Sequence, residues 1–523
     1  MLILRLMKAT IHSKWKLQLK CICFQVPPST GIIRHVVVTA LFLTALLLAT
    51  FLLTTFILAT FMKETILQAK MFHANVIRPL NHLIRAKFKG FENMECKNSS
   101  LLFFDKPGVL TDIQHRNIVG YYPLTTLTSE SPIEIKIPGS AEDYIDLGDI
   151  NLYVKFKIVA ADGTAIKQAD DVVGLNNLPI STIWSDARLK IGETQIEGGQ
   201  TDYAYRSYFK TVTQFSPQAQ TSQMEAMGWY KDEAGKFDNA SNKGFVKRKQ
   251  LVGDSKVIEF MGPLMFDFFN QNRHLLSKMD MIITLTPNKS EFFLNSYAAS
   301  GKMRGYKIEF LKAAVYAGRL EMNPSVINGH AVGLNTDNAR YFINHSDLFV
   351  FSIPAGQASI IKENLLNAMK PKMLVVAMVE NDAYNGNISK NPFNFQHFDL
   401  VHLQLTRDGR TMPGGNLEPN FKENEFLHSY VQTMKAFDYW NTDDTNGLKP
   451  HEWANGYNYY AFDLTPDKEA SSSCLHAHTS GNLRLELKFA NKLTSTVNVI
   501  VYAVSDSQVE VTKNRDVILH YMR

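Results

Sequence analysis

Two histidines near the end of the chain have the residue types and spacing of a metal site. They belong to the stretch Cys474-Leu475-His476-Ala477-His478. Alternate residues of a strand point to the same face, so His476 and His478 would present both imidazoles on one side. The serines at positions 471 to 473 are typical of a loop, and a surface loop is the favoured interpretation. We therefore predict no metal and no cofactor, with His476 and His478 as the best candidates in the chain.

Other sequence motifs give no support to an enzymatic function. The histidine pair resembles the opening of a cupin metal motif, but a cupin then has a glutamate a few residues later, whereas Glu486 comes too late here. His451-Glu452 lacks the second histidine of a helical zinc-protease motif, and the chain has no nucleophile-elbow or phosphate-binding motif. The prediction is that the protein is not an enzyme, with a two-domain cupin-like metalloenzyme kept as an alternative.

Short strands predominate from about residue 101 onward. In Gly481 to Phe489, leucines and a phenylalanine alternate with charged residues, the period of a strand with one dry and one wet face. Thr496 to Val504 is apolar on both faces, as expected for a strand that is covered on both sides. The other predicted strands are 132–137, 149–159, 187–196, 256–261, 279–286, 306–317, 339–353, 372–379, 400–406 and 457–464.

These strands form two series of about eight each, which is the strand count of a jelly roll. Turns are predicted at Asp408-Gly409, Gly414-Gly415 and Asn446-Gly447, since glycine readily adopts positive φ. The fold predicted for the body is all-β, a double jelly roll of two eight-stranded antiparallel sandwiches with inserted helices and long loops. We predict a first jelly roll over residues 97–322 and a second over residues 323–523.

Each series is interrupted by a helix and a long polar excursion. Tyr205, Tyr208, Phe209 and Val212 form a one-sided helical stripe in the first half, and residues 426–437 form a similar stripe in the second. Long loops inside a compact β domain usually have a function, here predicted to be contact with neighbouring subunits. The aromatic interface candidates in these excursions, expected to be exposed, are Trp229, Tyr230, Tyr439 and Trp440.

The basic excess of the chain is confined to its first 95 residues. This segment has 12 Lys and Arg against 3 Asp and Glu, a net charge of +9. The whole chain has 55 against 50, so the remainder has 43 against 47 and a net charge of −4. A mildly acidic body gives no indication of a nucleic-acid-binding surface.

Residues 1–96 are predicted to be a basic extension with a transmembrane helix over residues 36–62. These 27 residues carry no charge, and as a helix they would span about 40 Å, more than the roughly 30 Å of a bilayer core. The basic residues before residue 36 favour a cytoplasmic N-terminus. Two alternatives remain open: an upstream reading frame joined to the body, and a hydrophobic helix buried in an assembly.

Several stretches of the body resemble the major capsid proteins of Polinton/Maverick-type DNA elements and their adintovirus relatives. They occur in order from about residue 101 to residue 515, some four fifths of the chain. The residues that carry the resemblance are 101–107, 131–134, 144–147, 203–208, 229–232, 351–354, 379–386, 390–395 and the closing block that begins at Asn455-Gly456-Tyr457 and includes Phe462-Asp463-Leu464-Thr465-Pro466.

The resemblance implies a structural protein that assembles as pseudo-hexagonal homotrimers into an icosahedral shell around double-stranded DNA. Its implied partners are further copies of itself, minor capsid proteins and packaged DNA without sequence-specific contact. The implied location is the virion or an intracellular capsid assembly. Residues 1–96 have no counterpart in that family, and it is their hydropathy that predicts single-pass membrane association through residues 36–62 if the segment is translated with the body. Pro392, Phe393 and Phe395 are further interface candidates, because two large rings lie beside a stiff proline; a loop that plugs its own sandwich is the alternative.

A membrane-anchored β-sandwich binding module is the second hypothesis for the chain. It would use its aromatic loops to recognise a ligand such as a glycan, and it requires a luminal body. The chain contains glycosylation sequons at Asn98, Asn239, Asn288, Asn344 and Asn387.

Overall fold

The computed structural model describes residues 110–167, 171–297, 305–366, 371–443, 445–471, 475–476 and 481–521. Residues 106–523 belong to one compact unit. The predicted extension 1–96, the hydrophobic segment 36–62 and His478 lie outside the described residues. Within the described part, no helix is both long enough and apolar enough to cross a membrane.

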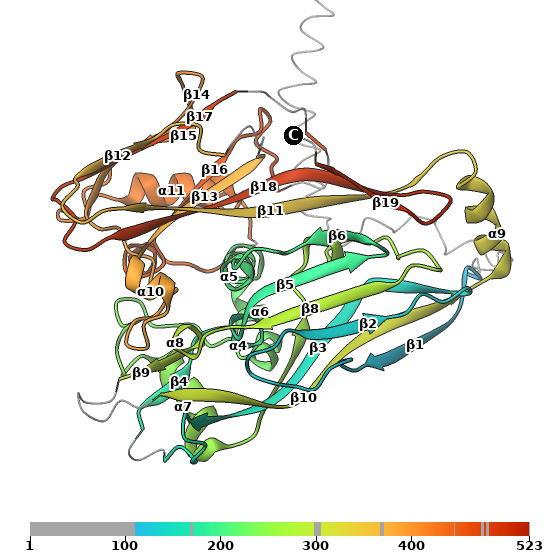
Figure 1. Cartoon of the computed structure of the whole chain (residues 1–523). Helices are drawn as coiled ribbons and strands as arrows, with labels where there is room; N and C mark the ends of the chain where they lie inside the picture. The colour runs from blue at the N-terminus through green and yellow to red at the C-terminus, as the bar shows by residue number, and fades with distance from the viewer. Residues whose placement is uncertain are drawn as a thin grey trace, which may run out of the picture. The chain divides into compact units, whose positions relative to one another are not determined.

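The first half of the described chain is a sandwich of two antiparallel sheets (Figure 1). One sheet has the order β1-β10-β3-β7 and the other the order β2-β8-β5-β6. The strands are β1 (Ile113–Tyr121), β2 (Ile133–Ile137), β3 (Asp143–Ala160), β5 (Trp184–Ile191), β6 (Thr194–Glu197), β7 (Ile258–Pro263), β8 (Met281–Pro287) and β10 (Tyr306–Met322). A small separate sheet pairs β4 (Val173–Leu175) with β9 (Leu294–Ser296).

The second half repeats this architecture. Its sheets have the orders β11-β18-β13-β16 and β12-β17-β14-β15, and β19 pairs with the far end of β18. The strands are β11 (Ala339–Ile353), β12 (Ser359–Lys362), β13 (Met373–Glu380), β14 (Leu400–Arg407), β15 (Arg410–Leu417), β16 (Tyr459–Asp463), β17 (Leu483–Phe489), β18 (Val497–Val511) and β19 (Val517–Tyr521).

The two halves share one topology when the eight sandwich strands described in each are counted along the chain. Both have one sheet in the order first, eighth, third, sixth and one in the order second, seventh, fourth, fifth. This is the strand order of a jelly roll. Among the described residues, strands of the first half pair with one another and so do those of the second. The exact domain boundaries at residues 97, 322 and 523 stay predictions.

Helices occupy the connections between strands. In the first half they are α4 (Pro179–Thr182), α5 (Tyr203–Gln214), α6 (Pro217–Gln220), α7 (Lys243–Val252), α8 (Ser290–Phe293) and the 3₁₀ turns η3 (Gln223–Met227), η4 (Gly253–Ser255) and η5 (Asp267–Phe269). Helix α9 (Pro324–Gly333) lies between the halves in sequence, and the second half contains α10 (Asn381–Asn385), α11 (Leu427–Ala436) and α12 (Pro450–Ala454).

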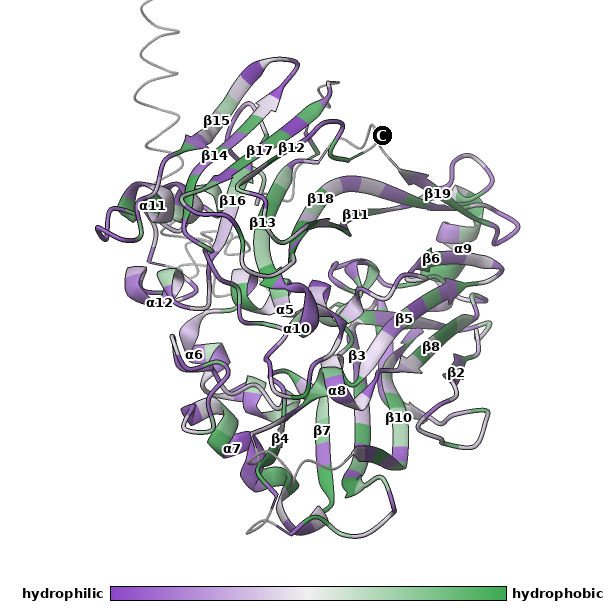
Figure 2. Cartoon of the chain, turned by 60° about the vertical axis from the view of Figure 1, so that its left-hand side comes forward, coloured by the Kyte–Doolittle hydropathy of each residue, from purple (hydrophilic) through white to green (hydrophobic). Residues whose placement is uncertain are grey.

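The predicted alternation places apolar side chains in the sandwich cores. Ile133, Ile135 and Ile137 of β2 are fully buried, and the alternation of hydrophobic and hydrophilic residues along the strands is visible in Figure 2. Trp184 of β5 stacks on Phe310 of β10 with ring centroids 5.3 Å apart, which joins the two sheets of the first sandwich. Strand β18 is buried on both faces over Val497–Ala503, as predicted.

The sequence-based prediction is wrong at some strands and turns. Strands β1, β12, β15 and β19 are not among the predicted strands. Gly414-Gly415 lies inside β15 and not in a turn between strands, although Gly414 does adopt positive φ. The Asp408-Gly409 turn is confirmed, because it connects β14 to β15.

Candidate functional site

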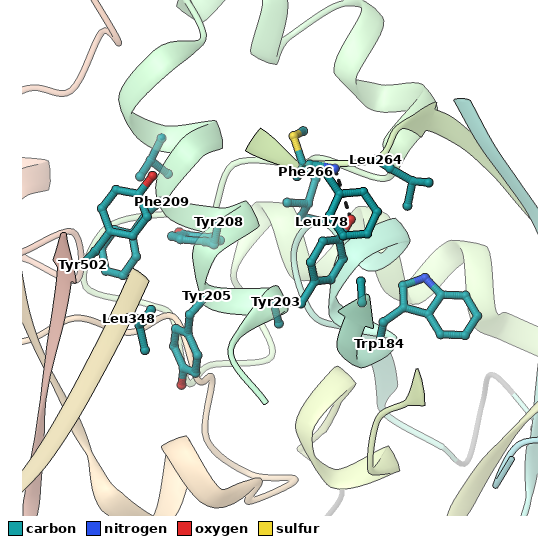
Figure 3. Close-up of a cluster of buried hydrophobic side chains, with 14 of the residues drawn as sticks. Leu178, Trp184, Tyr203, Tyr205, Tyr208, Phe209, Leu264, Phe266, Leu348 and Tyr502 are labelled. Carbon is teal, nitrogen blue, oxygen red and sulfur yellow. Dashed lines mark hydrogen bonds between the residues drawn. The ribbon is translucent and has the colours of Figure 1, made fainter. Parts of the chain in front are cut away.

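Helix α5 forms the centre of the junction between the two jelly rolls. Eleven of its twelve residues are buried, which for a helix of mixed composition requires partners on every side. Toward its own sandwich, the ring of Tyr203 lies 6.0 Å from that of Phe266. On the other side, the ring of Phe209 lies 5.5 Å from that of Tyr502 on β18 (Figure 3). The predicted aromatic stripe is therefore confirmed as a helix, and it joins the two halves.

The segment Asn391–Phe395 of the second half is anchored on α5. The ring of Phe393 stacks on Tyr208 with centroids 4.1 Å apart, and the ring of Phe395 stacks on Phe209 at 5.2 Å. The hydroxyl of Tyr205 donates to the carbonyl of Pro392 at 3.1 Å. Both phenylalanines are fully buried, so in this conformation their rings are used within the chain. A contact of this segment with a neighbouring subunit stays a prediction.

A buried ionic cluster surrounds the polar residues of α5. Arg206 lies 3.6 Å from Glu197 and donates to the carbonyl of Ser346 on β11 at 3.1 Å. Asp267 forms an ion pair with Lys210 and accepts hydrogen bonds from the backbone and hydroxyl of Ser346 at 2.8 and 2.7 Å. Removing one partner of such a buried pair costs several kcal/mol, about 3–5 in general, because the other charge is left uncompensated. The cluster therefore fixes one relative placement of the two sandwiches.

The pKa values of the two carboxyls in this cluster shift in opposite directions: that of Glu197 is raised and that of Asp267 is lowered. Burial raises the pKa of the Glu197 carboxyl, and the nearby charge of Asp267 adds to this effect. For Asp267, burial would also raise the pKa, but the charges of Lys210 and Arg206 outweigh it and lower the pKa. A paired acid and base with separated pKa values can mark a catalytic site. Here both carboxyls are buried at the junction, where the cluster links the first jelly roll to Ser346 of the second.

The predicted excursion around Trp229 and Asp232 contributes to a second buried contact. The guanidinium of Arg248 donates to Asp232 at 2.6 Å and to the carbonyl of Tyr230 at 2.5 Å. From the second half, the hydroxyl of Tyr457 donates to the Asp232 carbonyl at 2.9 Å. The ring of Trp229 lies 5.5 Å from that of Tyr208 and is fully buried. The expectation that Trp229 is exposed is therefore wrong, because the excursion folds back onto α5.

The other aromatic interface candidates differ in exposure. Tyr230 is half-buried, with the ammonium of Lys247 located 5.2 Å from the centroid of its ring. Tyr439 is also half-buried and donates its hydroxyl to the carbonyl of Thr213. Trp440 is exposed and is the member of the set that is free to contact another molecule. Sequence alone could not separate these residues, because the separation depends on long-range packing.

The structure places His476 beside carboxylates. Its imidazole nitrogens lie 3.5 Å from Asp506 and 3.9 Å from Asp467, and its backbone N–H donates to Asp506 at 3.0 Å. Within the described residues, no group of three or more His, Cys, Asp or Glu side chains could hold a metal ion. The prediction about a metal at His476 and His478 is not decided, since His478 lies outside that part of the chain.

A surface pocket of about 490 Å³ opens where residues 235–239 meet residues 394–399 and 454–456. Its carboxylate Asp238 accepts hydrogen bonds from the Asn391 backbone at 2.5 Å and from the Asn394 amide at 2.7 Å. The imidazole of His397 stacks on Phe421 with centroids 3.9 Å apart, and burial lowers its pKa. Both groups are thus held by the fold, and their arrangement does not define a reaction.

Comparisons with known proteins agree with this topology. No family model matches the chain. An uncharacterized protein of Caenorhabditis elegans is 24% identical over 396 residues, which cover 73% of this chain and 92% of that protein. A chain of the Sputnik virophage, solved by cryo-electron microscopy, matches with a TM-score of 0.54 and 12% identity over 82% of this chain and 93% of its own. The chain has the double jelly-roll fold.

The structural neighbours are double jelly-roll major capsid proteins of giant viruses and virophages. The mavirus major capsid protein is another of them, with a TM-score of 0.49 and 10% identity over 81% of this chain and 93% of its own. The strand topology and the likeness to the Sputnik virophage chain confirm the predicted fold class of the body.

Proposed function

We propose that this chain is the major capsid protein of a Polinton/Maverick-type, adintovirus-like DNA element. In this proposal it forms pseudo-hexagonal homotrimers that tile an icosahedral shell around double-stranded DNA, and its location is the virion or an intracellular capsid assembly. Minor capsid proteins and packaged DNA are the proposed partners, the DNA without sequence-specific contact. The jelly rolls over residues 97–322 and 323–523 are the two building blocks that each chain contributes to the trimer.

One observation carries the proposal. The two sandwiches have the same strand order and are fixed against each other by α5, its buried ionic cluster and the anchor of residues 391–395. A rigid pair of similar domains is suited to a ring in which three chains supply six similar positions. The likeness to the Sputnik virophage chain supports this assignment at the level of the fold.

The alternative of a membrane-anchored binding module receives no support from the structural neighbours. A structural role also agrees with the hydrogen bonding of the carboxylates. Asp267 at the junction and Asp238 in the surface pocket both accept hydrogen bonds from other residues of the chain. We propose no reaction for this protein.

The test is the assembly state of the purified full-length chain. Analytical ultracentrifugation should show a species with three times the mass of the 59.2 kDa chain. Negative-stain electron microscopy should show particles with a hexagonal outline. Each contact between chains should bury at least the roughly 1,200 to 2,000 Å² of a standard interface. A monodisperse monomer at high protein concentration would overturn the proposal.

A further inference from the structure

One sheet occupies the same position in both jelly rolls, but its outer face is covered in only one of them. In the second jelly roll the sheet is β11-β18-β13-β16, and Leu348, Val375 and Tyr502 on its outer face are buried. Tyr502 packs on Phe209 of α5, so the covering element belongs to the first jelly roll. In the first jelly roll the corresponding sheet is β1-β10-β3-β7.

The outer face of sheet β1-β10-β3-β7 is open to solvent and rich in tyrosine. We call it the tyrosine face and define it by Ile118, Tyr122, Tyr153, Met261, Lys312 and Tyr316. Ile118 is 65% exposed, Tyr122 54% and Met261 42%. Exposed apolar and tyrosine side chains gathered on one face are typical of a protein-binding surface.

The tyrosine face is ordered by its own contacts. The ammonium of Lys312 lies 5.5 Å from the ring centroids of both Tyr122 and Tyr153, and the ring of Tyr316 lies 6.4 Å from that of Tyr153. Gly120 allows this arrangement, since a Cβ at that position would be 3.0 Å from the Tyr316 ring. Rings held in place before binding lose little conformational entropy when a partner docks.

Helix α11 of the second jelly roll is largely exposed, whereas its counterpart α5 in the first jelly roll is buried. Helix α5 follows the fifth strand of the first sandwich, and α11 follows the fifth strand of the second. Of the ten residues of α11 only Ser429, Thr433, Met434 and Ala436 are buried, whereas α5 is buried along nearly its whole length. We call the exposed side of this region the α11 surface, defined by Leu427, Val431, Lys435, Asp438 and Trp440. Leu427 is 57% and Trp440 49% exposed.

Unpaired charges on the two surfaces are complementary. On the outer face of the first sheet, Lys155, Lys307 and Lys312 have no carboxylate within 4 Å among the described residues. Around α11, in the same described part, the acidic side chains of Glu423, Glu425, Asp438 and Asp443 have no basic partner within that distance, against the two lysines Lys422 and Lys435. Glu259 lies on the same sheet face, where it accepts a hydrogen bond from the Tyr153 hydroxyl at 2.8 Å, and it has no basic partner within 4 Å among the described residues. A net of two positive charges on this face therefore matches a net of two negative charges around α11, which favours encounter of these surfaces.

We propose that the tyrosine face of one copy of this chain docks on the α11 surface of a second copy. The contact repeats between chains the packing of α5 on the sheet face within the chain. It joins different surfaces on the two copies, so it is head-to-tail and can close into a ring. This inference rests on the proposed function as a self-assembling protein and adds which surfaces meet.

The first experiment uses substitutions of exposed residues in the full-length chain. Ile118→Glu alters the tyrosine face and Trp440→Glu alters the α11 surface. Each should weaken trimer formation at least 10-fold in sedimentation velocity, because each places a charge in a buried contact. Val332→Glu on α9 is the matched control, since Val332 is 67% exposed and lies on neither surface. At protein concentrations low enough for all three variants to be monomeric, thermal unfolding should be similar, because none of the changed side chains is in a core.

The second experiment places a photo-cross-linking amino acid at Tyr122 in an equal mixture of isotopically heavy and light chains. Cross-linked peptides that join position 122 to residues 418–443 of the other isotope are expected. Two outcomes would overturn the surface assignment and leave the proposed function standing. One is cross-links from position 122 to other regions of the chain. The other is a trimeric wild type together with Ile118→Glu and Trp440→Glu variants that both still form trimers. A wild-type chain that remains monomeric would overturn both.

Discussion

His345 shows how a single residue at the junction responds to the charges around it. Its imidazole lies 3.3 Å from Asp347 and 4.0 Å from Asp267. Burial alone would lower its pKa, but the hydrogen bond and charge of Asp347, with the charges of Asp267 and Glu197, outweigh burial and raise the pKa above its ordinary value. The protonated imidazole therefore stabilises the contact between β11 and the first jelly roll.

The sign of the resulting pH dependence follows from linkage. A histidine with a raised pKa in the folded state binds more protons when folded, so its contribution is complete below about pH 6.5 and is lost as the pH rises through the folded pKa. We predict that the free energy of unfolding of the wild type, relative to His345→Gln, falls as the pH is raised through the range that begins at about 6.5, the ordinary pKa of histidine. Urea denaturation across this range measures it. The exposed His520, changed to Gln, is the control; a difference independent of pH for His345→Gln would contradict the prediction.

At the scale of elements, the loop around Gly456 holds the anchor segment against the first jelly roll. The backbone N–H of Phe395 donates to the carbonyl of Gly456 at 3.0 Å. Gly456 has a φ of +108°, and a Cβ at this position would lie 2.2 Å from the ring of Phe237. Both the backbone conformation and the close approach of the ring therefore require glycine.

The effect of Gly456→Ala can be divided into its two causes. Gly163 also has positive φ, +86°, but nothing lies within 4 Å of a Cβ placed there. We expect Gly163→Ala to destabilise the protein by about 1–2 kcal/mol through backbone strain alone. Gly456→Ala should cost about 1–3 kcal/mol more, because Phe237 must move from a packed site. Guanidinium denaturation of both variants measures the difference. Equal losses would show that the ring moves away at no cost.

Sequence patterns predicted the interior strands of this fold better than its edges. The predicted strand 149–159 lies within the interior strand β3, and the predicted strand 372–379 matches the interior strand β13 to within one residue at each end. Strands β1, β12 and β15 lie at sheet edges. β1 is exposed over most of its length on both faces, so its sequence lacks the period of a half-buried strand.

The candidate site was predictable only in part. The stripe on α5 and the ring pair Phe393 and Phe395 could be found from the sequence, because large apolar residues at regular spacing must be buried somewhere. Their pairing across the two halves, and the burial of Trp229, depend on contacts between residues far apart in the chain. The ionic partners Glu197 and Asp267 were not predicted, since isolated acidic residues in a sequence usually indicate solvent exposure.

At the scale of the whole molecule, the double jelly roll has one covered and one open copy of the same sheet face. Within the chain, α5 covers the face of the second sandwich, and the tyrosine face of the first is left for another molecule. A closed ring satisfies every such face, whereas an isolated chain always leaves one sheet face and one α11 surface exposed. The unequal covering of the two sheet faces therefore favours an oligomer of defined size, built from contacts that join two different surfaces.

Mixing two defective variants tests this head-to-tail arrangement. Chains with Ile118→Glu keep an intact α11 surface, and chains with Trp440→Glu keep an intact tyrosine face. Neither variant should assemble alone. An equal mixture should form one-to-one pairs, in which the intact α11 surface of one chain docks on the intact tyrosine face of the other. These pairs cannot close a ring, because the two surfaces left free on each pair both carry a substitution. Native mass spectrometry distinguishes the pair from single chains and trimers. If the tyrosine face instead paired with itself, Trp440→Glu chains would associate without a partner variant, and mixing would produce no new species.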